Sequence, residues 1–121
     1  MKRIEAIIRR TKFEEVKEAL DKVGIEWFTY SNVRGLGKSR QERIYRGITY
    51  DTSNIERIMI TIVVREKYLE KTIDAILKNA RSGECGEIGD GRIFVSSVEE
   101  IYKIRTGEKG DQVLKGVNDE S

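Results

Sequence analysis

The sequence has 121 residues, of which 38% are hydrophobic, and this is enough for one domain with a modest core. The 23 lysine and arginine residues nearly balance the 21 aspartate and glutamate residues, so the net charge of +2 gives no reason to expect nucleic-acid binding. No apolar run reaches the about 18 residues of a membrane span, and the charged start MKRIEAIIRR is unlike a signal peptide. We therefore expect a cytoplasmic protein without direct membrane insertion. With no histidine and one cysteine, Cys85, a single chain cannot assemble a zinc site or an internal disulfide.

Residues 3–33 predict a strand, a helix and a second strand. Ile4, Ala6 and Ile8 alternate with other residues, which predicts a strand over residues 3–9 with one buried face. Residues 12–24 predict a helix, with Thr11 as its N-cap and Gly24 as its end. The hydrophobic residues of this helix recur at helical spacing: Phe13, Val16, Leu20 and Val23. Residues 26–33 are rich in aromatic and β-branched side chains, which favours a second strand.

The middle of the chain begins with a long segment, residues 34–54, that has no regular hydrophobic pattern. A segment of this length inside a small domain is usually functional or mobile. Residues 56–65 are apolar enough for a central strand. Residues 66–80 predict a second helix. The residues expected on its buried face are Leu69, Ile73, Ile76, Leu77 and Ala80.

A glycine-rich segment, SGECGEIGDG, follows the second helix and leads into two expected strands, residues 92–98 and 100–106. Residues 107–121 are polar, and we expect them to fray. This element order is that of the ferredoxin-like α+β sandwich, βαββαβ, in which an antiparallel sheet carries two helices on one face. The other sheet face keeps substantial apolar content, so we expect self-association.

The glycine-rich segment is a candidate anion site, because it holds four glycines in ten residues. Backbone N–H groups in such a turn can converge on a phosphate, since no Cβ keeps the ligand away. Arg92 follows directly, and Lys103 and Arg105 would point to one side of the last strand. The alternative is a tight turn beside a solvated strand face.

Two further features lie in and just after the long segment. Gly35 and Gly37 would allow a strand end to approach a ligand closely, with Lys38 or Arg40 touching phosphate. The alternative for this stretch is a flexible strand exit. The second feature is a group of tyrosine and arginine residues with one glycine among them: Tyr45, Arg46, Gly47, Tyr50 and Arg57. Tyrosine and arginine often anchor protein interfaces, so these residues favour a loop that docks onto a partner protein. The alternative is a flexible loop without a partner, which would more usually be rich in serine, glycine and proline.

Two motifs resemble signatures of the PII signal-transduction protein family. YRGITY, residues 45–50, resembles the family's loop motif Y-K/R-G-x-x-Y, and GEIGDGRIFV resembles a second signature around G-D-G-K/R-I-F. IRTGE, residues 104–108, is similar to the end of the family's last core strand. The similarity covers residues 1–110, which implies one domain followed by a polar tail, residues 111–121.

The resemblance implies a homotrimer that binds ATP or ADP in clefts between subunits. Residues 37–55 would form the T-loop, which reaches a regulated transporter or enzyme, and residues 82–92 would form the phosphate-gripping B-loop. In relatives, the targets include ammonium channels, nitrogen-assimilation enzymes and nitrogenase. The nucleotide-binding positions of the family correspond here to Ile7, Thr29, Gly35, Gly37, Lys38, Val63, Gly89, Asp90, Gly91, Arg92, Lys103 and Arg105.

The partner-contacting positions that the resemblance implies are Tyr45, Arg46, Tyr50 and Arg57. Tyr50 falls where many bacterial relatives carry a uridylylated tyrosine. Arg57 falls where a lysine usually holds the carboxylate of 2-oxoglutarate. The resemblance implies a regulator and not an enzyme.

The sequence departs from the family pattern at three places. Ser39 stands where a glutamine usually helps to chelate magnesium and contacts 2-oxoglutarate, so magnesium-dependent 2-oxoglutarate binding lacks one of its family ligands. Gln41 is nearby, and the loop is slightly shorter than in bacterial relatives. The B-loop is three residues longer than the family pattern, because SGE is followed by CGE. The sequence favours extra residues that bulge away from the phosphate, because Gly89 to Arg92 and the strand after them are intact. The alternative is that Glu84 and Glu87 lie near the site and weaken binding of a triphosphate.

These departures leave other functions open. One is a PII-like sensor of a different adenine nucleotide or of bicarbonate, controlling a transporter or enzyme outside nitrogen metabolism. A weak ATPase is a second, although no catalytic base or metal pair is evident. A purely structural trimer is the third, and it predicts no nucleotide binding.

Overall fold

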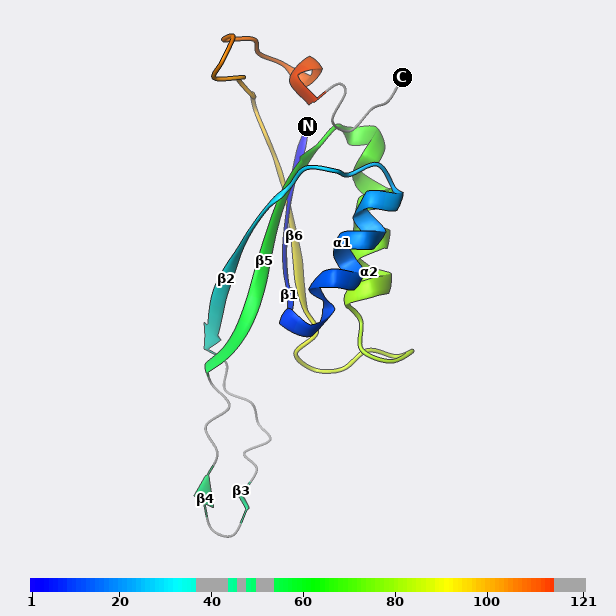
Figure 1. Cartoon of the computed structure of the whole chain (residues 1–121), viewed down its shortest axis with the longest axis vertical. Helices are drawn as coiled ribbons and strands as arrows, with labels where there is room; N and C mark the ends of the chain where they lie inside the picture. Colours follow the sequence, from blue (N-terminus) through cyan, green and yellow to red (C-terminus); the bar gives the residue numbers. More distant parts are fainter. Residues whose placement is uncertain (37–43, 46–47, 50–53, 115–121) are drawn as a thin grey trace.

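The computed structural model of the chain describes residues 1–36, 44–45, 48–49 and 54–114. Four strands form one antiparallel sheet in the order β2-β5-β1-β6, and the two α-helices lie on one face of it (Figure 1). The strands are β1 (Lys2–Arg9), β2 (Thr29–Leu36), β3 (Ile44–Tyr45), β4 (Ile48–Thr49), β5 (Asn54–Val64) and β6 (Gly91–Ser97), and the helices are α1 (Phe13–Lys22) and α2 (Leu69–Ala80). Short 3-10 helices are η1 (Arg10–Lys12), η2 (Glu66–Tyr68) and η3 (Asp111–Leu114). The predicted ferredoxin-like fold class is confirmed.

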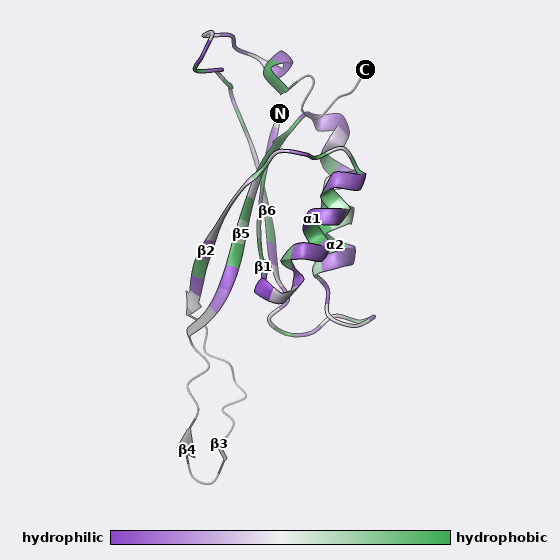
Figure 2. Ribbon diagram, viewed as in Figure 1, coloured by the Kyte–Doolittle hydropathy of each residue, from purple (hydrophilic) through white to green (hydrophobic). Residues whose placement is uncertain are grey.

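The core lies between the two central strands and the helices. The predicted alternation in β1 buries Ile4, Ala6 and Ile8, and each pairs with a buried isoleucine of β5. Val16 and Leu20 of α1 and Ile76 of α2 cover them, and all three are at most 1% exposed. Since successive strand residues point to opposite faces, the other residues of β1 and β5 lie on a face that no helix covers. Figure 2 shows that the hydrophilic residues of β5 lie near the start of the strand.

Residues 37–53 connect β2 to β5, and they fall inside the segment expected to form the T-loop. Within this connection β3 pairs with β4, with Ile44 opposite Thr49 and Tyr45 opposite Ile48. Strands of two residues are too short to produce a periodic hydrophobic pattern, so these two strands could not be predicted from the sequence.

Two predictions about the helices are wrong. Thr11 is not an N-cap, because it lies within η1, and Lys12 at the start of α1 makes no side-chain capping hydrogen bond. Leu77 is 42% exposed, because the buried stripe of α2 runs through Thr72, Ile76 and Ala80 at four-residue spacing. Thr72 can take a core position because its hydroxyl donates to the carbonyl oxygen of Tyr68 at 2.6 Å.

Two strand predictions also need correction. The second strand begins at Thr29 and ends at Leu36, so it starts and ends three residues later than residues 26–33. Residues 100–106 form no strand, because their backbone groups bond within a local turn instead of to a neighbouring strand. After β6, Val98 N donates to the carbonyl oxygen of Met1. The segment then folds on itself, with Lys103 N donating to Glu108 O at 2.7 Å.

The segment expected to be a frayed polar tail starts with an ordered turn. Asp111–Leu114 form η3, Leu114 is only 7% exposed, and Arg65 pairs with Asp111 at 3.5 Å. Residues 115–121 lie outside the described residues. In the part of the chain that the structure describes, no helix is long and apolar enough to cross a membrane.

Replacing Gly91 with alanine should destabilise the chain by more than about 1 kcal/mol. Gly91 has φ +110°, and a Cβ there would collide with the carbonyl oxygen of Ile7 across the β1–β6 pairing. Gly35→Ala is the matched control, because no atom lies within 4 Å of its Cβ position. Urea unfolding at neutral pH measures the free energy of unfolding of both variants. Equal losses of stability would contradict the close contact at Gly91.

Candidate functional site

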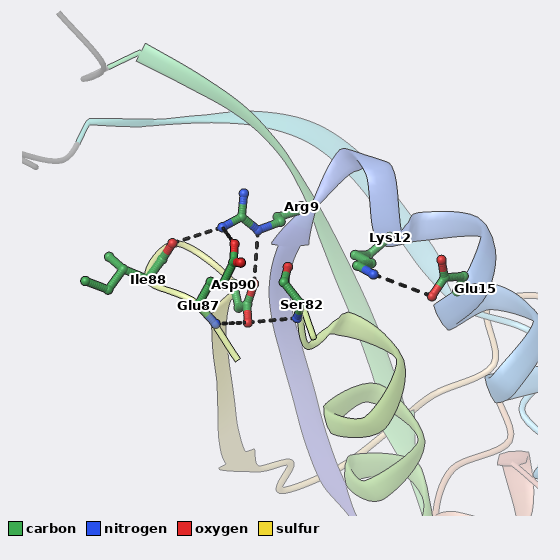
Figure 3. A network of polar contacts seen from close by, with 7 residues as sticks. All are labelled: Arg9, Lys12, Glu15, Ser82, Glu87, Ile88 and Asp90. Carbon is green, nitrogen blue, oxygen red and sulfur yellow. Dashed lines mark hydrogen bonds and ion pairs between the residues drawn. The ribbon is translucent and has the colours of Figure 1, made fainter. Parts of the chain in front are cut away.

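The B-loop, residues 82–92, folds around the carboxylate of Asp90. Asp90 Oδ2 accepts hydrogen bonds from the backbone N–H groups of Ser82 at 3.0 Å and Glu87 at 2.8 Å (Figure 3). All four glycines of the loop adopt positive φ, which other residues rarely do. The path of the loop therefore explains why the segment between α2 and β6 contains four glycines, which is more than a simple turn would need.

Arg9, the last residue of β1, fastens this loop to the sheet. Its Nε donates to Asp90 Oδ1 at 3.0 Å and its Nη2 donates to the carbonyl oxygen of Ile88 at 2.9 Å. The carboxylate of Glu87 lies 4.0 Å from the same Nη2. Figure 3 shows the Arg9 side chain reaching over residues 87–90. The loop is therefore held both by its own hydrogen bonds and by a guanidinium from the sheet.

The hydrogen bonds determine the charge state of Asp90. The backbone N–H groups of Ser82 and Glu87 lower the pKa of Asp90 well below its ordinary value, and the bond from Arg9 lowers it further. The carboxylate is thus ionised throughout the physiological range. Because its two oxygens already have partners, Asp90 shapes the loop instead of offering a free acceptor to a ligand.

Positive charge gathers where the B-loop meets β1 and β5. Arg9 lies directly opposite Arg57, and a Cβ on Gly89 would lie 3.2 Å from Nη2 of each. Burial lowers the pKa of Arg57 and the neighbouring Arg9 lowers it further, while Asp90 opposes this shift. Within residues 1–36 and 54–114, neither the Arg57 nor the Arg92 side chain has a hydrogen-bond or ion-pair partner. Two guanidinium groups are therefore available to an anion beside the loop.

Six of the predicted site residues share the sheet face that no helix covers. Ile7 faces away from the buried Ile8, and it pairs with Arg92 of β6. By the same alternation the face includes Ile7, Thr29, Gly35, Arg57, Val63 and Arg92. Gly35 and Arg57 lie toward the end of the sheet that carries the T-loop, whereas Thr29 and Val63 lie farther along it. The structure thus brings this group onto one surface with the B-loop at one end.

Lys103 and Arg105 do not join Arg92 within one chain. They follow the far end of β6, and the seven residues of that strand place its two ends about 20 Å apart. Figure 1 shows the two loops at opposite ends of the sheet. The expectation that these two cations flank the B-loop is therefore not met inside a single subunit.

Several predicted residues cannot be placed. Gly37, Lys38, Arg46 and Tyr50 lie outside the described residues, and Tyr45 is described only as part of the β3 strand. Among the residues that the structure does describe, no three histidine, cysteine, aspartate or glutamate side chains gather as metal ligands.

Sequence reasoning missed Arg9. The only local signal is its position, since it continues the alternation of β1 onto the uncovered face at the strand end. Its partners Ile88 and Asp90 are 79 and 81 residues away along the chain, so no local pattern connects them.

The sheet order, the two helices and the glycine-rich loop define a ferredoxin-like domain with a loop at one end of its sheet. The profile of the family described as nitrogen regulatory protein P-II matches residues 1–108. The chain belongs to this family, whose members are signal transducers.

Curated relatives match over nearly their whole lengths. The nitrogen regulatory protein P-II of Bradyrhizobium diazoefficiens is 44% identical over 91% of this chain and 96% of its own. That of Azospirillum brasilense is 43% identical over 94% of this chain and all of its own. Nitrogen regulatory protein P-II 1 of Methanothermobacter thermautotrophicus is 45% identical over 94% of this chain and 97% of its own length.

Asp90→Asn should destabilise the chain at neutral pH, and the deficit should shrink in acid. A carboxylate with a lowered folded-state pKa contributes stability above its unfolded value of about 4, and this contribution is lost as pH falls toward the folded value. Urea unfolding at pH 7 and at about pH 2.5 measures the change across that window. Asp74→Asn on α2 is the control, because Asp74 is exposed and has no polar partner in residues 1–36 and 54–114. A deficit for Asp90→Asn that is equal at both pH values would refute the charge assignment.

Proposed function

We propose that this chain is a cytoplasmic regulator that binds ATP or ADP between the subunits of a homotrimer and acts on a transporter or enzyme of nitrogen metabolism through its T-loop. The observation that carries the proposal is the B-loop closed on Asp90 beside the guanidinium groups of Arg57 and Arg92, whose side chains have no polar partner among the described residues. Turnover of the nucleotide is not part of the proposed role.

The phosphates would lie against the B-loop. Gly89 has no Cβ to keep a phosphate from the loop backbone, and Nη2 of Arg57 lies 3.2 Å from the position that a Cβ would take. Arg57 and Arg92 supply positive charge on the same sheet face. Asp90 supports this arrangement indirectly, because its charge is already balanced by Arg9. A polyphosphate then meets a net positive surface and not a free carboxylate.

The base of the nucleotide would lie along the uncovered sheet face. Ile7 and Val63 offer half-buried apolar contacts, and Thr29 offers a hydroxyl across from Thr61. Lys103 and Arg105 would come from the neighbouring subunit, since their own subunit holds them at the far end of the sheet. The site would then be complete only in an assembly.

Exposed apolar surface supports the proposed assembly. Phe94 is 52% exposed on the uncovered face of β6, and Val95 and Leu77 are 45% and 42% exposed. These two side chains line a groove of about 490 Å³ between β6 and α2, beside an edge strand. Apolar surface beside an open strand edge is usually covered by another chain.

Signal output would follow from the position of the site. Gly35 and Arg57 lie in the two strands that enter and leave the T-loop, so a ligand between them contacts both ends of the loop. A nucleotide changes the loop only if it binds one loop conformation better than another. The partner is proposed to be a protein that recognises the loop around Tyr45, Arg46 and Tyr50. Magnesium-dependent 2-oxoglutarate binding is not part of the proposal, because Ser39 stands where the family glutamine would contact both ligands.

Calorimetric titration with ATP and with ADP should show binding, and Arg92→Ala should weaken it about tenfold or more by loss of a charge-assisted contact. A mixture of subunits tests where Lys103 and Arg105 act. Co-refolded Arg92→Ala and Arg105→Ala chains should recover part of the binding that each lacks alone, because some clefts then contain both arginines. No binding by the unmodified chain would overturn the proposed function, and no recovery would overturn the shared site.

Light scattering should give the mass of three chains for the purified protein. Phe94→Glu should lower this mass, because a carboxylate on the uncovered sheet face opposes burial against another subunit. Lys78→Glu places a carboxylate on the exposed side of α2 and should leave the mass unchanged. A monomeric wild-type chain would contradict the proposed assembly.

A further inference from the structure

Arg9 makes three polar contacts with residues of the B-loop. Its guanidinium meets Asp90 Oδ1 at 3.0 Å, the Ile88 carbonyl oxygen at 2.9 Å and the Glu87 carboxylate at 4.0 Å. The side chain is 29% exposed, so these contacts are partly shielded from water. Charge-assisted hydrogen bonds in such surroundings are stronger than exposed ones.

The two oxygens of Asp90 have different partners. Oδ2 accepts from Ser82 N and Glu87 N, and these bonds close the loop on itself. Oδ1 accepts from Arg9, and this bond connects the closed loop to β1. The connection to β1 and the internal closure of the loop are therefore separate interactions.

We propose that Arg9 is a positioning residue of the nucleotide site, and this inference rests on the proposed function. It holds the closed B-loop against the end of β1, so that Gly89 to Arg92 face the same surface as Arg57. Arg9 acts on the site through the loop, because its Nε donates to Asp90 and its Nη2 donates to Ile88. Arg57, which flanks Gly89 without a described partner, remains available to the ligand.

The guanidinium shape matters as much as the charge in this role. Arg9 uses Nε for one partner and Nη2 for another, so its planar fork spans the Asp90 carboxylate and the Ile88 carbonyl together. A lysine ammonium is a single point charge on a flexible stem and does not reproduce this geometry. Lysine at position 9 keeps the local charge and loses the double contact.

The test compares Arg9→Ala and Arg9→Lys with Arg10→Ala. Arg10 is the matched control, because the same charge is removed one residue away, from an exposed side chain that pairs with Glu56 at 2.8 Å and not with the B-loop. Hydrogen exchange of the Ser82 and Glu87 amides reports the loop without any ligand. Calorimetry with ATP reports affinity, and circular dichroism confirms that each variant is folded.

We expect Arg9→Ala and Arg9→Lys each to speed exchange of the two amides and to weaken ATP binding, both by about tenfold, as loss of one charge-assisted hydrogen bond implies. Arg10→Ala should change neither by more than about twofold. The double variant Arg9→Ala, Asp90→Asn should bind ATP no more weakly than the weaker single variant, because both changes break the same link.

Three results would overturn the proposal. One is unchanged exchange at Ser82 and Glu87 in Arg9→Ala. A second is weaker ATP binding without faster exchange, which would mean that Arg9 contacts the ligand directly. The third is full affinity in Arg9→Lys, which would mean that charge alone suffices. If the wild-type chain binds neither ATP nor ADP, the proposed function fails, and the exchange comparison still decides whether Arg9 positions the loop.

Discussion

The carboxylate of Asp90 is the group on which the B-loop depends. One oxygen closes the loop through Ser82 and Glu87, and the other connects it to Arg9 at the end of β1. The four positive-φ glycines fit a path that these bonds define. The chain's own residues therefore hold the loop in one conformation, and a preorganised loop loses less conformational entropy on binding.

The end of β1 contacts both regions that a nucleotide-responsive regulator needs to connect. Arg9 holds the B-loop, and the next residue, Arg10, pairs with Glu56 near the end of the T-loop connection. Arg57 lies beside Glu56 and opposite Arg9. A change at the proposed phosphate site would thus act close to the strand that leaves the T-loop, without needing a long path through the core.

The sequence predicted those features in which local pattern and burial coincide. The alternating isoleucines of β1 and β5 and the helical spacing in α1 predicted the fold, because one face of each element is buried. Residues 100–106 were predicted wrongly, since a strand also needs a neighbouring strand and these residues bond within their own turn, as Lys103 N does to Glu108 O. Leu77 was wrongly predicted to be buried, because a hydrophobicity pattern does not predict that Thr72 is in the core. Thr72 is buried because its hydroxyl donates to a backbone carbonyl oxygen. Arg9 was missed because its partners lie about 80 residues away and meet it only in the folded chain.

The central claim is that the B-loop is a preformed phosphate cradle, and backbone amide chemical shifts during an ATP titration test it most directly. The account predicts large shifts at Gly89 and Gly91, with the Ser82 and Glu87 amides remaining protected from exchange throughout. Shifts confined to other parts of the sheet, or loss of protection at Ser82 and Glu87 as ATP binds, would contradict it.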